Sequence, residues 1–395
     1  MNMDELNKIY IEPTNRCNLK CVTCVRNSWD EPFGDMEWSV YQKLIDGLAD
    51  FPSVKTIAFA GLGEPLLHPK LPEMIRLAHE RGLRTEMTSN AMLLTKEMAG
   101  RLIDARLDQF TVSIDGGSND VYEKIRPGSS LEQITANVAD LCRQSVAKTR
   151  GDNSGIAQFR LAHLCRQSTA KTDELKRITI GIIFVAMKSN IQGLPAIKKI
   201  ASNIRASFII VTNVLPYTAG MQNEILYRSR PAAHRVTESS LYPLWILPNM
   251  DFTEETMKPL FEIFRDSSNL AFLDLPMSMR NNYCPFIGNG SFSVGWHGGI
   301  SPCLPLMHSY PCYIRNREKK FIRCEYGRLT DRSLKEIWMD PEYVSFRSRV
   351  RKFDFPPCTD CEGCELADTN EEDCYNNKFP TCGDCLWARG ILRCP

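Results

Sequence analysis

The distribution of cysteine constrains this chain more than any other feature of its sequence. The 395 residues include 16 cysteines; three lie within eight positions near the N-terminus, and eleven lie between Cys284 and Cys394. The N-terminal segment carries acidic side chains where a secretory signal carries basic ones, and no apolar run approaches the roughly 18 residues of a membrane span. We therefore expect a cytoplasmic protein without a membrane partner, in which clustered cysteines are metal ligands rather than disulfides. Their spacing predicts two separate metal-binding regions.

The charge of the chain argues against one large class of function. Lys and Arg number 48 and Asp and Glu 47, which gives a net charge of +1. Proteins built around a nucleic acid usually show a basic excess, so we expect no nucleic-acid partner. The apolar share of 43% and the charged share of 24% are typical of a globular protein with a sizeable core. The length predicts two or three domains, or one large barrel with an extension.

Strand-like segments alternate with helical patterns in the N-terminal part of the chain. Six segments have the apolar, β-prone composition of buried strands: residues 9–12, 56–61, 84–90, 109–116, 179–187 and 207–213. This alternation predicts an α/β fold with parallel strands and right-handed crossovers, either a barrel or an open doubly wound sheet. In both architectures ligands bind at the carboxyl ends of the strands. We divide the chain into residues 1–216, a connecting segment 217–281 and a small cysteine-rich domain 282–395.

One short sequence occurs twice. LCRQSVAKT at residues 141–149 returns as LCRQSTAKT at residues 164–172. Repeat architectures need three or more copies to bury a continuous core. We interpret the pair as a tandem duplication that lengthens a surface connection. Cys142 and Cys165 are then one position copied twice, and we do not expect them to be ligands.

The loop after the first predicted strand carries Cys17, Cys21 and Cys24 in a C-x3-C-x2-C spacing. Three thiolates so close together can hold three irons of a 4Fe–4S cluster and leave the fourth iron without a protein ligand. A metal with an open position can bind a substrate, as in catalytic zinc sites. The alternatives are a zinc loop or core cysteines without a metal.

Polar residues follow the next three predicted strands. In the motif GLGEP, residues 61–65, the glycines allow a ligand to approach the backbone closely, and Glu64 can accept hydrogen bonds from an ammonium group. The planar guanidinium of Arg126 suits a ligand carboxylate. Each residue alone is more typical of a turn or a helix cap, but together they predict a ligand site beside the three cysteines. The candidates are Gly61, Gly63, Glu64, Asn90, Ser113 and Arg126, with Ser89 and Asp115 nearby.

With these motifs, residues 8–216 resemble the radical S-adenosylmethionine (SAM) superfamily. The resemblance implies a partial (β/α)6 barrel of the TIM type. It also implies a 4Fe–4S cluster whose open iron chelates SAM, and an electron that splits SAM into methionine and a 5′-deoxyadenosyl radical. One departure is Thr23, which stands where the family usually has an aromatic residue before the third cysteine.

The same resemblance assigns roles to the polar residues. It places Glu64 against the amino group of the methionine moiety. It places Asn90, Ser113 and Arg126 at contacts to the ribose and the carboxylate. As a partner it implies a low-potential electron donor of the ferredoxin or flavodoxin type.

The C-terminal cysteines allow two interpretations. A zinc ribbon fits Cys361-x2-Cys364 and Cys382-x2-Cys385 but leaves surplus thiols. The spacing from Cys284 to Cys303, followed by a dense cysteine tail, resembles the SPASM extension, which implies one or two auxiliary 4Fe–4S clusters. Because two clusters need eight thiolates, one of the nine candidates is then spare. The candidates are Cys284, Cys303, Cys358, Cys361, Cys364, Cys374, Cys382, Cys385 and Cys394.

Other cysteines and histidines nearby are not expected to bind a metal. Cys312 and Cys324 lie in a basic, polar stretch, and we expect them to be free. His297 and His308 flank Cys303, and we interpret them as surface or hydrogen-bonded residues.

The strings PTCGDCLWARGILRCP, CNLKCVTC and GLGEPLLHP are similar to the radical SAM/SPASM proteins associated with tungsten-dependent aldehyde:ferredoxin oxidoreductases. This resemblance implies an enzyme that modifies a precursor of the tungsten cofactor or the oxidoreductase polypeptide. Two alternatives stay open. One is a peptide-modifying SPASM maturase or a pterin-forming cyclase of the molybdenum-cofactor type. The other is a non-enzymatic iron–sulfur or zinc-ribbon protein.

Overall fold

The structure is a computed structural model. It describes residues 6–151, 177–227, 244–248, 250–251, 253–265, 269–272, 283–314, 317–356, 358 and 364–394. Cys165, Cys361 and the second copy of the duplicated sequence lie outside these residues. No helix among them is long and apolar enough to cross a membrane.

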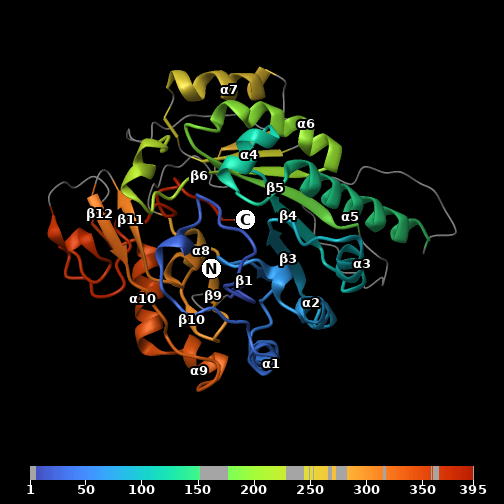
Figure 1. The fold of residues 1–395 in the computed structure, drawn as a ribbon. Coiled ribbons are helices and arrows are strands. Elements are labelled where there is room, and N and C mark those ends of the chain that lie inside the picture. Colours follow the sequence, from blue (N-terminus) through green and yellow to red (C-terminus); the bar gives the residue numbers. More distant parts are fainter. Residues whose placement is uncertain are drawn as a thin grey trace.

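A ten-stranded sheet forms the framework of the molecule, in the order β10-β9-β1-β2-β3-β4-β5-β6-β7-β8 (Figure 1). Neighbouring strands are parallel except for the pair β9 and β10. Within the described residues β1 and β6 are not neighbours, so the barrel is open. The strands are β1 (Lys8–Ile11), β2 (Thr56–Phe59), β3 (Arg84–Ser89), β4 (Gln109–Ser113), β5 (Thr179–Ala186), β6 (Phe208–Asn213), β7 (Leu244–Leu247), β8 (Asn269–Phe272), β9 (Ser291–Val294) and β10 (Ile300–Ser301).

The predicted α/β fold is confirmed, and each of the six predicted strands is present as β1 to β6. Four strands that were not predicted extend the sheet at its two edges. β7 and β8 come from the segment expected to be a connection, and β9 comes from the cysteine-rich region and pairs with β1. The predicted division at residues 216 and 281 therefore crosses a continuous sheet, and it stays a prediction.

Helices cover the outer face of the parallel strands (Figure 1). They are α1 (Trp38–Gly47), α2 (Leu71–Glu80), α3 (Lys96–Asp104), α4 (Asn119–Ile125), α5 (Leu131–Gly151), α6 (Leu194–Ile204) and α7 (Glu254–Arg265). In α2 the residues Leu71, Met74, Ile75 and Ala78 recur at helical spacing and are fully buried. The first copy of the duplicated sequence belongs to α5, where Cys142 is buried.

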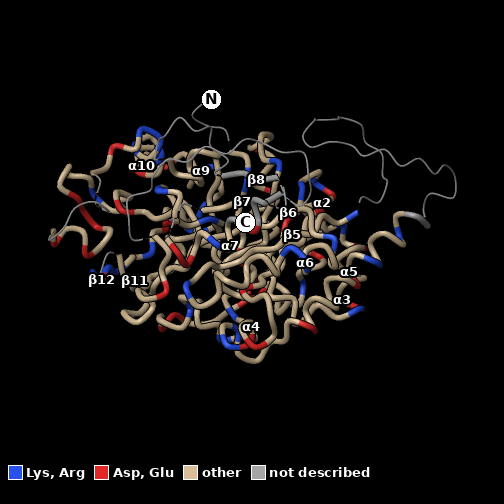
Figure 2. Tube along the Cα trace, turned by 90° about the horizontal axis from the view of Figure 1, so that it is seen from above, with Lys and Arg blue, Asp and Glu red and all other residues tan. Residues whose placement is uncertain are grey.

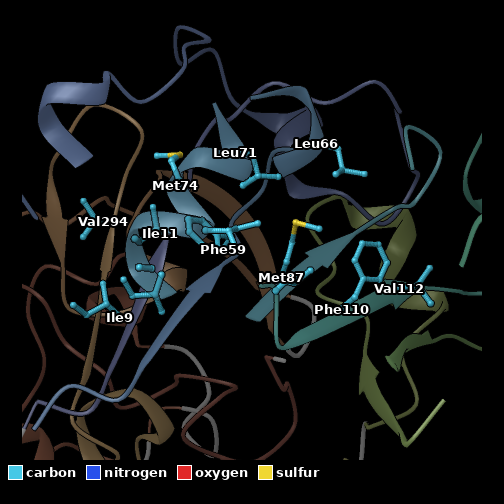
Figure 3. Close-up of a cluster of buried hydrophobic side chains, with 14 of the residues drawn as sticks. Ile9, Ile11, Phe59, Leu66, Leu71, Met74, Met87, Phe110, Val112 and Val294 are labelled. Atoms are coloured by element: carbon cyan, nitrogen blue, oxygen red, sulfur yellow. The ribbon is translucent and has the colours of Figure 1, made fainter. Parts of the chain in front are cut away.

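Side-chain alternation along the strands separates the core from the inside of the barrel. Ile9 and Ile11 of β1 pack with Phe59, Met87 and Phe110 of the next strands against the helices (Figure 3). Because successive side chains of a strand point to opposite faces, the residues between them face the inside of the barrel. Figure 3 shows this outer core between the strands and α2.

The cysteine-rich region packs against the β1 side of the sheet (Figure 1). Its remaining elements are α8 (Pro285–Gly288), β11 (Tyr310–Ile314), β12 (Arg317–Phe321), α9 (Leu334–Trp338) and α10 (Pro341–Lys352). α10 begins after Asp340, whose carboxylate accepts a hydrogen bond from the Glu342 N–H at 3.0 Å, with Pro341 in the first turn. Along the trace, acidic and basic residues are interspersed (Figure 2).

Candidate functional site

A cavity of about 330 Å³ lies at the carboxyl ends of the parallel strands. Its wall includes the three cysteines of the N-terminal loop and all six predicted ligand-binding residues. Side chains of the cysteine-rich region close the opposite wall. The lining residues discussed below are Glu12, Cys17, Cys21, Cys24, Gly61, Gly63, Glu64, Asn90, Ser113, Arg126, Met307, His308, Tyr310, Trp387 and Cys394.

The three-cysteine loop is held in place by backbone hydrogen bonds. The Cys24 N–H donates to the Cys21 carbonyl at 3.1 Å, and the Val22 N–H donates to the Ile125 carbonyl of α4 at 2.9 Å. Burial raises the pKa of the thiols of Cys17, Cys21 and Cys24. The loop therefore presents three thiols to one end of the cavity, in partly desolvated positions.

Close contacts with the loop after β1 require glycine at both glycine positions of the GLGEP motif. A Cβ on Gly63 would lie 1.9 Å from the Thr14 carbonyl oxygen. Gly61 has a φ of +139°, and a Cβ there would lie 2.7 Å from the Glu12 side chain. The motif can thus pack its backbone against the cysteine loop only because both residues lack a side chain.

Glu64 is 2% exposed and joins the glycine motif to the end of β3. Its Oε1 accepts hydrogen bonds from the Ser89 hydroxyl at 2.7 Å and the Leu66 N–H at 3.1 Å, and its Oε2 accepts from the Asn90 N–H at 2.8 Å. Burial raises the pKa of this carboxyl. Glu64 therefore braces the turn and also forms part of the cavity wall.

Arg126 lines the cavity and forms an ion pair with Asp115. Its Nε and Nη2 both contact Asp115 Oδ2, at 2.8 and 2.6 Å, so this edge of the guanidinium does not face a ligand. Nη1 instead points to the Cys21 sulfur at 3.8 Å. Burial opposes the charge of Arg126, but the Asp115 carboxylate leaves its pKa above the usual value. The spacing of the sequence does not reveal that Asp115 lies within reach.

Asn90 and Ser113 lie where the sequence predicts them, at the ends of β3 and β4. The Asn90 side-chain amide donates to Asn18 Oδ1 at 2.9 Å and lies 3.8 Å from the Cys17 sulfur. Ser113 lines the cavity on the neighbouring strand. Both residues therefore lie beside the cysteine loop.

Sequence reasoning missed Glu12 and His308 as cavity residues. Glu12 follows β1 directly, and the alternation of Ile9 and Ile11 is the signal that places it inside the barrel. His308 was expected to be hydrogen-bonded, and both of its ring nitrogens contact carboxylates, Glu12 at 3.0 Å and Glu31 at 2.7 Å. Burial opposes the imidazolium, but the two carboxylates raise the pKa of His308 to about 9. His297, in contrast, pairs with Glu325 and does not line the cavity.

Four of the C-terminal cysteines surround a second, small cavity. They are Cys284, Cys303, Cys382 and Cys385. Cys284 precedes α8, Cys303 follows β10, and the other two lie in a turn in which the Cys385 N–H donates to the Cys382 carbonyl at 3.2 Å. Burial, and then the charges of the neighbouring thiolates, raises the pKa of Cys303 well above its usual value. The structure therefore groups Cys382 and Cys385 with the distant Cys284 and Cys303.

The remaining candidate cysteines lie elsewhere. Burial and the Asp384 carboxylate raise the pKa of Cys358 to about 11, with further contributions from nearby groups that include Cys374. Cys364 precedes the short helix Glu365–Asp368, and Cys361 lies outside the described residues. Cys394 lines the large cavity and accepts a hydrogen bond from the Trp387 indole at 3.2 Å.

The zinc-ribbon pattern is not assembled in the described part of the chain. Of its four cysteines, Cys382 and Cys385 line the small cavity, and Cys361 lies outside the described residues. Cys364 is also absent from the wall of the small cavity that holds Cys382 and Cys385. Cys312 and Cys324, expected to be free, are buried, 0% and 3% exposed.

Two family models match this chain, one in each cysteine-bearing region. Residues 11–150 match the family model of the radical SAM superfamily, and residues 284–365 match that of the SPASM iron–sulfur cluster-binding domain. The chain belongs to the radical SAM superfamily. The family models cover both the three-cysteine loop and the first five C-terminal candidate cysteines, from Cys284 to Cys364.

One relative matches over nearly its whole length. The chain is 29% identical over 393 residues to the tungsten-containing aldehyde ferredoxin oxidoreductase cofactor-modifying protein of Pyrococcus furiosus, which covers 98% of this chain and 96% of that protein. The GTP 3′,8-cyclase of Chlorobaculum tepidum is 34% identical, but over 131 residues that cover 32% of this chain and 38% of the cyclase.

Solved structures with bound S-adenosylmethionine share the fold. Native anSMEcpe with bound AdoMet aligns with a TM-score of 0.57 at 14% identity and covers 92% of each chain. SuiB of Streptococcus suis, bound to S-adenosylmethionine, aligns with a TM-score of 0.55 at 14% identity and covers 94% of this chain and 73% of SuiB. At this identity the likeness concerns the fold alone.

Superfamily membership and the SPASM match give the chain its cofactors, SAM and 4Fe–4S clusters. The residues present fit them. Three thiols face one end of a cavity large enough for a ligand, and four thiols surround a second cavity.

Proposed function

We propose that this protein reductively cleaves SAM and uses the resulting radical to modify a cofactor precursor or a polypeptide in the maturation of a tungsten-dependent oxidoreductase. One observation carries the proposal. The similarity to the cofactor-modifying protein spans almost the whole of both chains, including the region that lines the substrate side of the cavity. The similarity to the cyclase covers about a third of this chain.

The N-terminal half of the site holds the cofactors in this proposal. Cys17, Cys21 and Cys24 ligate the SAM cluster, which when reduced supplies the electron that splits SAM into methionine and a 5′-deoxyadenosyl radical. Gly61 and Gly63 give the ligand access to the backbone of the motif, and Glu64 offers its remaining acceptor position on Oε2 to the methionine ammonium group. The electron donor is a low-potential ferredoxin or flavodoxin.

Arg126, Asn90 and Ser113 complete this half of the site. Arg126 neutralises Asp115 and directs one N–H towards Cys21, so it supports the cysteine loop as well as the cavity wall. The side-chain amide of Asn90 lies 3.8 Å from the Cys17 sulfur and supports the cysteine loop in the same way. Ser113 offers a hydroxyl for the ribose.

The C-terminal cysteines hold two auxiliary clusters in this proposal. Cys284, Cys303, Cys382 and Cys385 hold the first, because they line one cavity. Cys358, Cys361, Cys364 and Cys374 hold the second. Cys394 is then the ninth, spare thiol, and its place in the large cavity agrees with this assignment.

The proposal is tested in a host strain that lacks this gene. We expect the wild-type gene to restore the activity of the tungsten-dependent oxidoreductase, and the triple replacement of Cys17, Cys21 and Cys24 by Ala to restore none. Cys142→Ala, a cysteine outside both cavities, is the matched control and should behave as wild type. Full oxidoreductase activity in the strain without the gene would refute the proposed pathway.

The same strain distinguishes a small precursor from a polypeptide. Its extract, separated into low-molecular-mass and protein fractions, is added to the reconstituted enzyme with SAM and dithionite. The fraction that increases the yield of 5′-deoxyadenosine contains the substrate.

A further inference from the structure

Three side chains from distant parts of the sequence form a buried ionic cluster at the wall of the large cavity. His308 Nε2 lies 3.0 Å from Glu12 Oε2, and His308 Nδ1 lies 2.7 Å from Glu31 Oε2. The Trp29 ring packs edge-on against the imidazole, with ring centroids 3.9 Å apart. Both nitrogens face carboxylates, so the ring is held as a doubly protonated imidazolium in one orientation.

The cluster reaches the cavity through Glu12. Glu12 and His308 both line the cavity, yet they are 0% and 1% exposed, so no bulk water replaces their contacts. Glu12 Oε1 accepts hydrogen bonds from the Leu62 N–H at 2.9 Å and from His308. Among the described residues, Oε2 accepts a hydrogen bond from His308 alone. One acceptor position of a fixed, buried carboxylate is therefore free for a ligand.

Glu12 lies where the two walls of the cavity meet. It follows β1 directly and accepts a hydrogen bond from the Leu62 N–H of the glycine motif, and its other partner is His308. The residues proposed to hold SAM lie on the loops after β1 to β4. His308 comes from the cysteine-rich region, together with Tyr310 and Trp387 on the same wall. Glu12 is thus a carboxylate at the junction of the two walls.

The cluster also leads to the surface. The Glu31 side chain is 19% exposed, and the Arg323 guanidinium lies 3.8 Å from it with 36% exposure. The groups that face His308 are therefore Glu12 from the end of β1 and Glu31 from the loop before α1, with Arg323 behind Glu31. A carboxylate, an imidazole and a second carboxylate thus form a continuous chain of contacts from the cavity wall to the surface.

We propose that Glu12 is a catalytic residue that binds an N–H or O–H group of the substrate and takes up its proton, and that His308 is the positioning residue that connects Glu12 with Glu31. The inference deepens the proposed function, because it assigns the acid–base group of the same site. In the proton transfer the substrate X–H bond breaks and an O–H bond forms on Glu12. His308 keeps both of its protons and stays hydrogen-bonded to Glu12 and Glu31, so the substrate loses one proton and Glu12 gains one. No electron moves in this step.

The test measures 5′-deoxyadenosine formed by the reconstituted, full-length enzyme with SAM and dithionite, with and without extract of the strain that lacks the gene. That extract contains the unmodified substrate whichever pathway it belongs to, so the test does not depend on the tungsten assignment. The stimulated part of the yield reports substrate turnover. The 5′-deoxyadenosine formed without extract and the iron content show whether the SAM-binding part of the site is intact.

We expect Glu12→Gln to lower the stimulated rate at least 10-fold more than the unstimulated rate, because positioned acid–base groups contribute about 100-fold or more. Glu12→Asp keeps the charge and should retain more stimulated activity than Glu12→Gln. We expect His308→Gln to lower the stimulated rate by a smaller factor. The matched control is His297→Gln, which removes a histidine with a similar 2.6 Å contact to a carboxylate outside the cavity.

Two outcomes would overturn the proposal. One is a stimulated rate of Glu12→Gln within twofold of wild type. The other is an equal loss of iron, unstimulated and stimulated activity in both Glu12 variants, which would make Glu12 a structural residue. Failure of the proposed pathway shows separately, as oxidoreductase activity that does not need the gene.

Discussion

At the scale of single residues, Glu64 combines a structural and a ligand-binding position. Three hydrogen bonds from the chain use three of its acceptor positions. Gln at this position keeps the shape but loses the charge. Its NH2 group would also face one of the N–H or hydroxyl donors that now bind the carboxylate. We expect Glu64→Gln to weaken SAM binding about 10-fold or more, because a charge-assisted hydrogen bond contributes roughly 1.5–3 kcal/mol. A SAM titration of the reconstituted variant measures this loss.

Glu80→Gln is the matched control for this titration, because Glu80 is an exposed residue at the end of α2. The iron content of both variants should equal that of wild type. An unchanged dissociation constant for Glu64→Gln would mean that Glu64 only braces the turn.

His308 makes the stability of the protein depend on pH. Its pKa is raised from 6.5 to about 9. The resulting stabilisation is fully present below about pH 6.5 and is lost as the pH rises through about 9, and it amounts to the order of 3 kcal/mol. We expect the difference in denaturation midpoint between wild type and His308→Gln to shrink between pH 6.5 and pH 9.5. His297→Gln serves as the control, and an equal difference at both pH values would contradict the assigned ion pairs.

At the scale of elements, the glycine motif and the cysteine loop form one packed unit. A methyl group on Gly63 would collide with the backbone of Thr14, so one of the two loops must move. We expect Gly63→Ala to abolish SAM cleavage and to lower the occupancy of the N-terminal cluster. Gly220→Ala is the control, because nothing lies within 4 Å of a Cβ there. Normal 5′-deoxyadenosine formation by Gly63→Ala would show that the contact is not needed.

The elements themselves could be predicted from local sequence. Apolar, β-prone runs predict the six central strands, and the helical patterns that alternate with them predict the parallel arrangement. The strand β9 could not be predicted as part of the same sheet, because its pairing with β1 joins residues that are far apart in the chain. Local patterns contain no information about such a partner.

At the scale of the whole molecule, the candidate site depends on contacts of large sequence separation. The three cysteines and the glycine motif could be predicted because each is a compact string. The pairing of Glu12 with His308 could not, because the two residues are 296 positions apart and meet only when the cysteine-rich region packs on the barrel. Long-range packing decides which polar side chains are left to bind a ligand.

The allocation of cysteines to clusters is also a property of the whole molecule, and iron analysis tests it. With three clusters the reconstituted protein should hold about 12 iron and 12 sulfide ions per chain, four of each per cluster. Cys385→Ala removes a thiol of the four-cysteine cavity, so we expect it to lose about four irons. Cys394→Ala removes a thiol that lies in the large cavity beside Trp387 and should keep the full count. The cysteines of the two variants lie nine positions apart in sequence, and only the fold separates their roles. If Cys394→Ala lost iron and Cys385→Ala kept the full count, Cys394 would be the cluster ligand and Cys385 the spare thiol.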